Sequence, residues 1–181
     1  LSIKAREQGF ELYITRDLDH AKSYAMGRYE GQNEKRFGLI ASSKSNILPM
    51  FGVDNDFMTT RRFRGGPWFN DPPNSVKSCC AFNSVATEFQ CQGLELDLPI
   101  VCWGDDLLWE NDGWKTKKTT RRSNLKNPHQ RRLDSYRVLL SRGRDGIIIF
   151  VPPLEKFDST YKVLVKSGLK TLNGSEGSQS I

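Results

Sequence analysis

Short apolar runs separated by polar turns recur along this chain and predict the strands of a sheet. The runs are rich in aromatic and β-branched residues, and Gly, Asp or Pro bounds most of them. Residues 100–103 are apolar throughout, which is typical of a central strand buried on both faces of a parallel sheet. The predicted strands are 10–15, 37–41, 79–85, 99–103 and 147–151.

Helical spacing of apolar residues follows the first predicted strand and precedes the last one. Residues 18–29 repeat apolar side chains at this spacing, and Asp17 precedes them as a cap. Pro128 opens a second helix, which is expected to run through Ser141. A strand, a helix and a second strand in this order form a parallel α/β unit. Shorter elements are predicted at 42–50 (helix or turn), near Glu88 (helix) and at 161–165 (strand or helix).

Two polar segments interrupt this pattern and are interpreted as insertion loops, at about 52–77 and 110–127. The first contains four aromatic residues, which favour a loop packed against the domain. The second is poor in apolar residues and is expected to be mobile. Residues 171–181 are rich in Gly and Ser and predict a flexible tail. The sequence therefore predicts one domain over 1–170.

Positive charge is concentrated in one part of the chain. The chain of 181 residues carries a net charge of +6, but the residues outside one basic run together carry a slight net negative charge. Both a solvated loop and a nucleic-acid contact account for such a run. The run contains no acid and comprises Lys115, Lys117, Lys118, Arg121, Arg122, Lys126, Arg131 and Arg132.

No segment predicts a membrane protein or a secreted one. The longest apolar runs fall well short of the ~20 residues that span a bilayer, and no signal peptide is evident. The four cysteines form no C-x-x-C pair and are interpreted as buried free thiols of a reducing cytoplasm. The chain begins at Leu1 rather than Met, which indicates a piece of a larger protein.

Arginines at the end of the second helix are the strongest chemical signal. The tetrad Ser141-Arg142-Gly143-Arg144 lies between an apolar helix and a buried strand. Such a position can hold a guanidinium rigidly and present it to phosphate charge from another domain. The tetrad resembles motif VI of superfamily 1 DNA and RNA helicases. Gly143, where that motif has alanine, is expected to loosen the turn.

A second match lies upstream in the order that these helicases require. Residues 87–97 resemble motif V, which is built around Gln-Gly-x-Glu and appears here from Gln92 to Glu95. Residues 9–17 and 36–44 are similar to a bacterial family of uncharacterised helicase-like proteins, whose core is related to the C-terminal half of Schlafen proteins. The resemblance covers about 1–153. It implies an α/β fold: a three-layer, RecA-like domain of the P-loop NTPase type with a mostly parallel central sheet.

The resemblance assigns a role to each matched residue. Arg142 is the expected arginine finger, and Arg144 assists it or pairs with an acid such as Glu95. Gln92, Gly93 and Glu95 are expected near the nucleotide. Lys44, after the strand at 37–41, stands where the family often has an arginine that reaches the γ-phosphate. Nucleic-acid contacts are expected from Thr87 and, in the basic run, from Lys117, Lys118, Arg121 and Arg122.

The chain lacks the other half of a nucleotide site. It contains no G-x-x-x-x-G-K-[ST] motif and no strand ending in the paired acids of a Walker B site. ATP and Mg²⁺ are therefore expected mainly on an N-terminal RecA-like domain of the same protein, with single-stranded DNA or RNA as the other partner. The fragment alone is expected to be inactive.

Two alternatives remain open. One is a nucleic-acid-binding or scaffold module that keeps a helicase fold without its motor role. The other is a metal-dependent nuclease that uses Glu95, Asp105 and Asp106. For Asp105 and Asp106 themselves, a solvated turn after a strand is the simpler interpretation, and no metal site is predicted.

Overall fold

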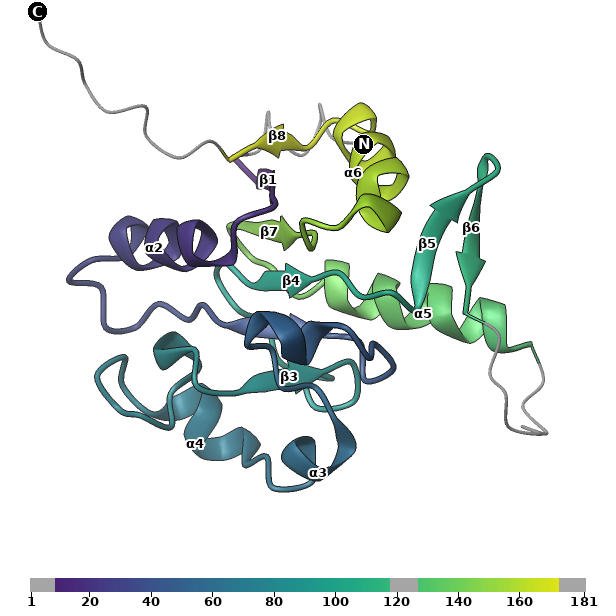
Figure 1. Cartoon of the computed structure of the whole chain (residues 1–181). Helices are drawn as coiled ribbons and strands as arrows, with labels where there is room; N and C mark the ends of the chain where they lie inside the picture. The colour runs from purple at the N-terminus through teal and green to yellow at the C-terminus, as the bar shows by residue number, and fades with distance from the viewer. Residues whose placement is uncertain (1–8, 118–126, 173–181) are drawn as a thin grey trace, which may run out of the picture.

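A six-stranded parallel sheet forms the centre of the protein (Figure 1). The computed structural model describes residues 9–117 and 127–172. The strand order is β3-β2-β4-β7-β1-β8, and every pairing within this sheet is parallel. The α/β class with a parallel central sheet is thus confirmed. The strands are β1 (Glu11–Thr15), β2 (Leu39–Ala41), β3 (Val85–Thr87), β4 (Ile100–Cys102), β7 (Gly146–Phe150) and β8 (Lys170–Thr171).

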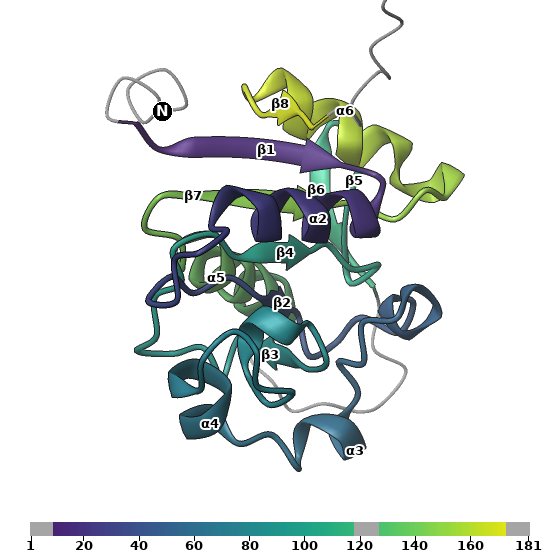
Figure 2. The same ribbon diagram turned by 90° about the vertical axis from the view of Figure 1, so that its left-hand side faces the viewer.

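Helices cover both faces of the sheet. Helices α2 (Leu18–Arg28) and α5 (Pro128–Leu140) lie on opposite faces (Figure 2). A hairpin of β5 (Leu107–Glu110) and β6 (Gly113–Thr116) contacts α6 (Asp158–Lys166) and α5. No helix in the described part of the chain is long and apolar enough to cross a membrane. The short helices are α3 (Phe57–Thr60), α4 (Gly65–Asn70), η1 (Leu48–Phe51), η2 (Cys79–Ala81) and η3 (Glu155–Phe157).

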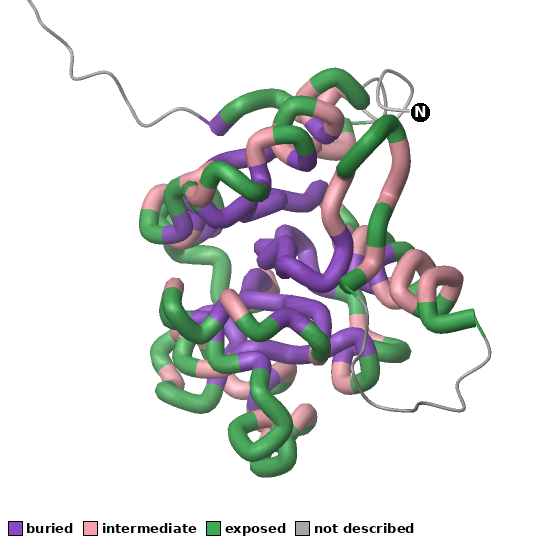
Figure 3. Tube along the Cα trace, turned by 45° about the vertical axis from the view of Figure 1, so that its right-hand side comes forward, coloured by how far each residue is buried: buried purple, intermediate pink, exposed green. Residues whose placement is uncertain are grey.

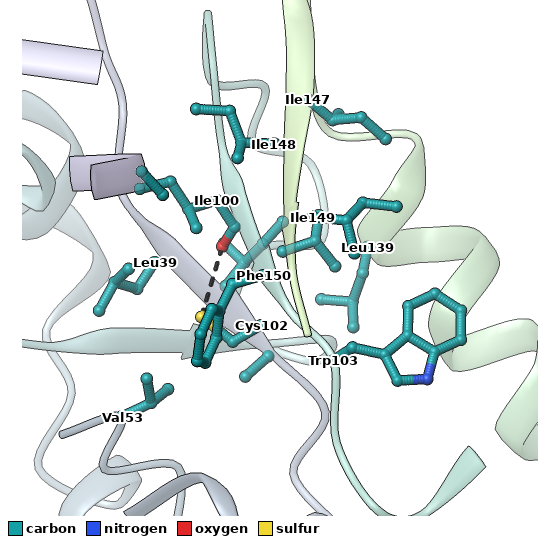
Figure 4. Close-up of a cluster of buried hydrophobic side chains, with 14 of the residues drawn as sticks. Leu39, Val53, Ile100, Cys102, Trp103, Leu139, Ile147, Ile148, Ile149 and Phe150 are labelled. Atoms are coloured by element: carbon teal, nitrogen blue, oxygen red, sulfur yellow. Dashed lines mark hydrogen bonds between the residues drawn. The ribbon is translucent and has the colours of Figure 1, made fainter. Parts of the chain in front are cut away.

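The core lies where β4 and β7 meet the two helix layers. All five residues of β7 are buried, as the continuous apolar run predicts. Their side chains pack with Ile100 of β4 and Leu139 of α5 (Figure 4). Burial of each large aliphatic side chain contributes about 1.5–3 kcal/mol. Buried positions follow the strands of the sheet, whereas the peripheral loops are largely exposed (Figure 3).

Helix α2 begins and ends close to its predicted bounds. The Asp17 carboxylate accepts a hydrogen bond from the backbone N–H of His20, which satisfies a free donor of the first turn. Ala21 and Ala25 have no exposed surface and lie in the core, so small side chains let the helix approach the sheet closely. The predicted helix from Pro128 is confirmed as α5, and 161–165 is helical within α6.

The strand predicted over 79–85 is wrong for most of its length. Cys79–Ala81 forms the 3₁₀ helix η2, which Ser78 caps, and Phe82 adopts a left-handed conformation with φ of 56°. Only Val85 onward pairs with β2. The helix predicted near Glu88 is wrong as well, because residues 88–93 form successive turns. All four cysteines are buried and free, as predicted.

The two predicted loops contain more structure than their composition suggested. Residues 52–77 include α3 and α4, and Trp68 is 2% exposed whereas Phe57 is 73% exposed. The segment 110–127 begins with β6, after a two-residue turn in which Asn111 and Asp112 both have positive φ. Residues 118–126 and 173–181 lie outside the described residues. At the start of the tail predicted over 171–181, Thr171 pairs with β1 as part of β8, and Leu172 is buried.

Candidate functional site

Two segments that are distant in sequence lie side by side where β4 and β7 begin. The backbone N–H of Leu96 donates to the carbonyl of Arg142, and that of Arg144 donates to the carbonyl of Leu96, each over 2.8 Å. Leu96 and Gly143 thereby form a parallel bridge. Residues 92–96 and 141–144 are called the amino edge below. The two helicase-like motifs therefore meet in space, although about 50 residues separate them in the chain.

Gly143 allows the chain to turn tightly into β7. A Cβ at position 143 would collide with the carbonyl oxygen of Gly146 and lie 2.9 Å from Cγ2 of Ile147. The expectation that glycine loosens this turn is therefore wrong, since the backbone here is too tightly packed for any side chain. Glycine is favoured at position 93 for a different reason, because the φ of 78° there lies in the left-handed region that glycine tolerates.

The guanidinium of Arg142 is held by neutral acceptors. Its Nε donates to the carbonyl of Val138 over 3.0 Å and its Nη2 to Oγ of Ser141 over 2.9 Å, with a longer contact of 3.4 Å from Nη1 to the carbonyl of Leu94. The residue is half-buried and forms no ion pair with any described residue. A cation at the end of a helix is also favoured by the helix dipole.

The other residues predicted to bind the nucleotide lie in two separate parts of the structure. Arg144 and Glu95 form an ion pair of 3.2 Å, and both side chains are more than half exposed, so the pair adds little stability. Gln92 and Gly93 are exposed beside them. Lys44 does not join this group. It follows the carboxyl end of β2, whereas the amino edge precedes β7.

A buried polar network lies at the opposite end of the strands, where β2, β3 and β4 finish. Arg132 of α5 reaches the carboxylate of Asp106 at 2.9 Å, Oγ of Ser42 at 2.9 Å and the carboxylate of Glu88 at 3.6 Å. The Ser42 hydroxyl donates to Asp106 over 2.5 Å. Glu88 also accepts from the backbone N–H and hydroxyl of Ser43. These contacts bind three strand ends to one helix.

Tyr136, one helical turn after Arg132, completes this network. Its hydroxyl donates to Oδ1 of Asp106 and accepts from the backbone N–H of Gly104, each over 2.9 Å. Burial, together with the charge of Asp106, raises the pKa of Tyr136 well above its ordinary value, so the phenol stays protonated. The ring also packs on Trp103 with centroids 4.4 Å apart.

Asp105 anchors two lysines at the same end. Its carboxylate accepts from the backbone N–H of Asn46 and lies 3.1 Å from Lys117 and 3.7 Å from Lys156. Burial alone would raise its pKa, but these partners outweigh burial and lower it. Asp105 and Asp106 are only 7% and 4% exposed. The interpretation of these acids as a solvated turn is therefore wrong.

The predicted nucleic-acid residues are only partly open to a ligand. Thr87 is 3% exposed, and its hydroxyl donates to the side-chain carbonyl of Gln90. Lys117 has a side chain that is 57% exposed. Exposed Lys44 and Lys156 lie at this same carboxyl end of the sheet. Lys118, Arg121 and Arg122 lie outside the described residues.

The acids of the nuclease alternative are not brought together. Glu95 belongs to the amino edge, whereas Asp105 and Asp106 follow the carboxyl end of β4. Within 9–117 and 127–172, no group of three or more His, Cys, Asp or Glu could hold a metal ion. The described residues thus offer cations to an anionic ligand at both ends of the strands.

The buried network is the part of the site that the sequence did not predict. Ser42 and Arg132 are 90 positions apart, and Asp106 lies 64 positions from Ser42. Arg132 stood out beforehand as one member of the basic run and Asp106 as an acid after a strand, but nothing in the sequence paired them. No local pattern could have shown that this arginine is 15% exposed and faces two buried acids.

Comparison with known proteins gives one family match. No curated protein and no solved structure matches the chain. A family model described as Schlafen group 3, DNA/RNA helicase domain, matches residues 2–153, which include both the amino edge and the buried network. The chain therefore belongs to the Schlafen group 3, DNA/RNA helicase domain family and is a helicase-like module.

Proposed function

We propose that this chain is the second RecA-like domain of a superfamily 1 ATP-dependent helicase or nucleic-acid-stimulated ATPase. The observation that carries the proposal is the bridge between Leu96 and Gly143, which places Gly93, Glu95, Arg142 and Arg144 along one edge. Residues that line one nucleotide site must lie close together in this way, whereas unrelated surface arginines need not.

Arg142 is proposed as the arginine finger. Its acceptors are two carbonyls and a hydroxyl, all uncharged. A phosphate oxygen forms a stronger, charge-assisted bond with a guanidinium than a neutral acceptor does, and it often binds both nitrogens of the fork. The side chain can therefore exchange these acceptors for the γ-phosphate of ATP. A RecA-like domain elsewhere in the same protein would hold the ATP with its Mg²⁺.

Glu95 and Arg144 are proposed to line the same nucleotide site. Their ion pair is exposed on both sides, so either partner can leave it at low cost. Gly93 allows close approach of the backbone, since it carries no Cβ and its φ of 78° would disfavour any other residue. In this site ATP supplies the phosphoryl group, and the chain supplies positive charge and a stretch of backbone that the nucleotide can approach closely.

Single-stranded DNA or RNA is proposed to bind at the carboxyl end of the sheet. Three lysines are exposed there: Lys44, Lys117 and Lys156. The buried carboxylate of Asp105 forms ion pairs with Lys117 and Lys156. Phosphate contacts of this kind give affinity without sequence preference. Closure of the two domains on ATP and their opening after hydrolysis would then move the domain along the strand.

ATP hydrolysis by the full-length protein, with and without oligothymidine or oligouridine, tests this proposal. We expect hydrolysis that the single strand stimulates severalfold or more. Strand binding without any hydrolysis would instead identify a nucleic-acid-binding module on a helicase fold. Cleavage of the strand by this chain alone, with a divalent metal and no ATP, would overturn the motor and identify a nuclease.

A further inference from the structure

A groove lies beyond the edge strand β3, and none of the site residues described above lines it. Its walls come from α3, α4 and the segment that leads into β3, and it encloses about 320 Å³. Phe63, Trp68 and Val85 form an apolar part of the lining, and the rings of Phe63 and Trp68 lie 5.4 Å apart. Figure 1 places α3 and α4 at the end of the molecule opposite to β8. The volume falls at the small end of the range for ligand pockets.

Three cations line this groove and are free to meet an anion. Arg62, Arg64 and Lys77 are all exposed, and none forms an ion pair with a described residue. By contrast, Arg132 and Lys35 each contact two acids. The nearby acids are Asp56, which caps α3 and accepts a hydrogen bond from Thr59 in the groove lining, and Asp71, which accepts one from Ser75. The groove thus combines an apolar floor with three cations that form no ion pair with a described residue.

The groove lies next to the carboxyl end of β3. Gln90 connects the two, because its amide nitrogen donates to the carbonyl of Thr60 in the groove wall and its amide oxygen accepts from Thr87 at the end of β3. A polymer that leaves the carboxyl end beside β3 therefore meets the groove next. This path distinguishes a long polyanion from a small anion.

We propose that the groove is a second contact for single-stranded nucleic acid, in which Arg62, Arg64 and Lys77 bind phosphates and the apolar floor receives a base. A single strand alternates phosphate charge with flat apolar bases, and this alternation matches the lining. The inference rests on the proposed function, because it extends the strand beyond the carboxyl end of the sheet.

Binding of a fluorescein-labelled 30-mer of oligothymidine to the full-length protein without ATP tests the groove. The double variant Arg62→Ala/Arg64→Ala is compared with Lys162→Ala/Lys166→Ala, which removes two exposed charges from α6. We expect the groove variant to raise Kd about tenfold and to lower the slope of log K against log salt by about 1.4, since each contact on a single strand contributes about 0.7. The α6 variant should change Kd less than about twofold.

Each other outcome has a definite meaning. Equal Kd values for the groove and α6 variants, with tight binding by the wild type, overturn the groove while leaving the proposed function intact. No binding by the wild type overturns both. Displacement of the strand by polyglutamate as effectively as by unlabelled oligothymidine, at equal charge, overturns a nucleic-acid site and identifies the groove as a contact for an acidic protein segment.

Discussion

At the scale of single residues, the amino edge depends on a position where no side chain fits. Gly143 lies against the backbone of Gly146, which is the first residue of the strand β7. The arginines on either side were identified from the sequence as candidate site residues, because they lie between a predicted helix and a predicted strand. It could not predict the packing of Gly143, because the obstructing carbonyl is set by how the chain turns into β7.

Gly143→Ala should therefore destabilise the domain. The added methyl group would displace the turn that carries Arg142, at a cost of about 1–3 kcal/mol in the free energy of unfolding. Urea denaturation measures this cost. Gly27→Ala in α2 is the matched control, because nothing lies within 4 Å of its Cβ position. Alanine favours helix there, so stability should stay the same or rise by up to about 1 kcal/mol. Equal effects of the two substitutions would refute the packing argument.

At the scale of elements, α5 joins the two ends of the sheet. Arg132 and Tyr136 fix it to the ends of β2, β3 and β4, and its last turn bonds the guanidinium of Arg142. Arg132 and Arg142 are ten positions apart, and α5 spans this stretch up to Leu140. The helix that is anchored at the carboxyl end thus also contacts the proposed finger.

Removal of the Arg132 charge should be costly. Arg132→Met would leave Glu88 and Asp106 buried without their cation, and breaking a buried pair in this way typically costs about 3–5 kcal/mol. Arg131→Met alters the exposed neighbour on the same helix and should change stability by less than about 0.5 kcal/mol. Urea denaturation of both variants decides the matter, and similar midpoints would mean that the network is not a stabilising anchor.

Elements with strong local signals were predictable, and those set by tertiary contacts were not. Asp17 and Pro128 mark the starts of α2 and α5 correctly, because capping and proline preferences act within a few residues. Residues 79–81 are apolar, but their cap and the left-handed Phe82 turn them into a short helix. The hairpin β5–β6 had a usable signal, since Asn111-Asp112-Gly113 is a turn sequence between two tryptophans.

At the scale of the whole molecule, one acidic residue connects four parts of the fold. Asp145 accepts from Tyr29 at the end of α2 and from Lys35, each over 2.8 Å, and Lys35 also contacts Asp97 before β4. The backbone carbonyl of Asp145 accepts from the N–H of Glu11 at the start of β1. The described part of the chain is thus held together, next to the amino edge, by charge as well as by the apolar core.

This arrangement predicts how stability depends on pH. Burial alone would raise the pKa of Asp145, but Lys35 and Tyr29 outweigh burial and lower it. A carboxyl group whose pKa is lowered by folding stabilises the native state above its unfolded pKa of about 3.9, and this contribution is lost as pH falls through the folded value. The difference in unfolding free energy between wild type and Asp145→Asn should therefore be largest near neutral pH and shrink below about pH 4.

Denaturant unfolding at a series of pH values measures that difference. Asp54→Asn changes an exposed carboxylate that has no ion pair with a described residue, and it should give a smaller difference at neutral pH. A difference for Asp145→Asn that persisted unchanged at pH 2 would contradict the assignment, because protonated aspartate and asparagine are then nearly equivalent.

The most direct test of the central claim compares ATP turnover by the full-length protein with Arg142→Ala and Arg137→Ala. Arg137 lies on α5, which ends two residues before Arg142, and its side chain is 71% exposed and pairs only with Asp134 among the described residues. The account predicts that Arg142→Ala lowers kcat about a thousandfold or more while ATP still binds, as for other arginine fingers, and that Arg137→Ala retains nearly full activity. If both variants hydrolysed ATP at the wild-type rate, Arg142 would be a helix-capping residue and not a finger.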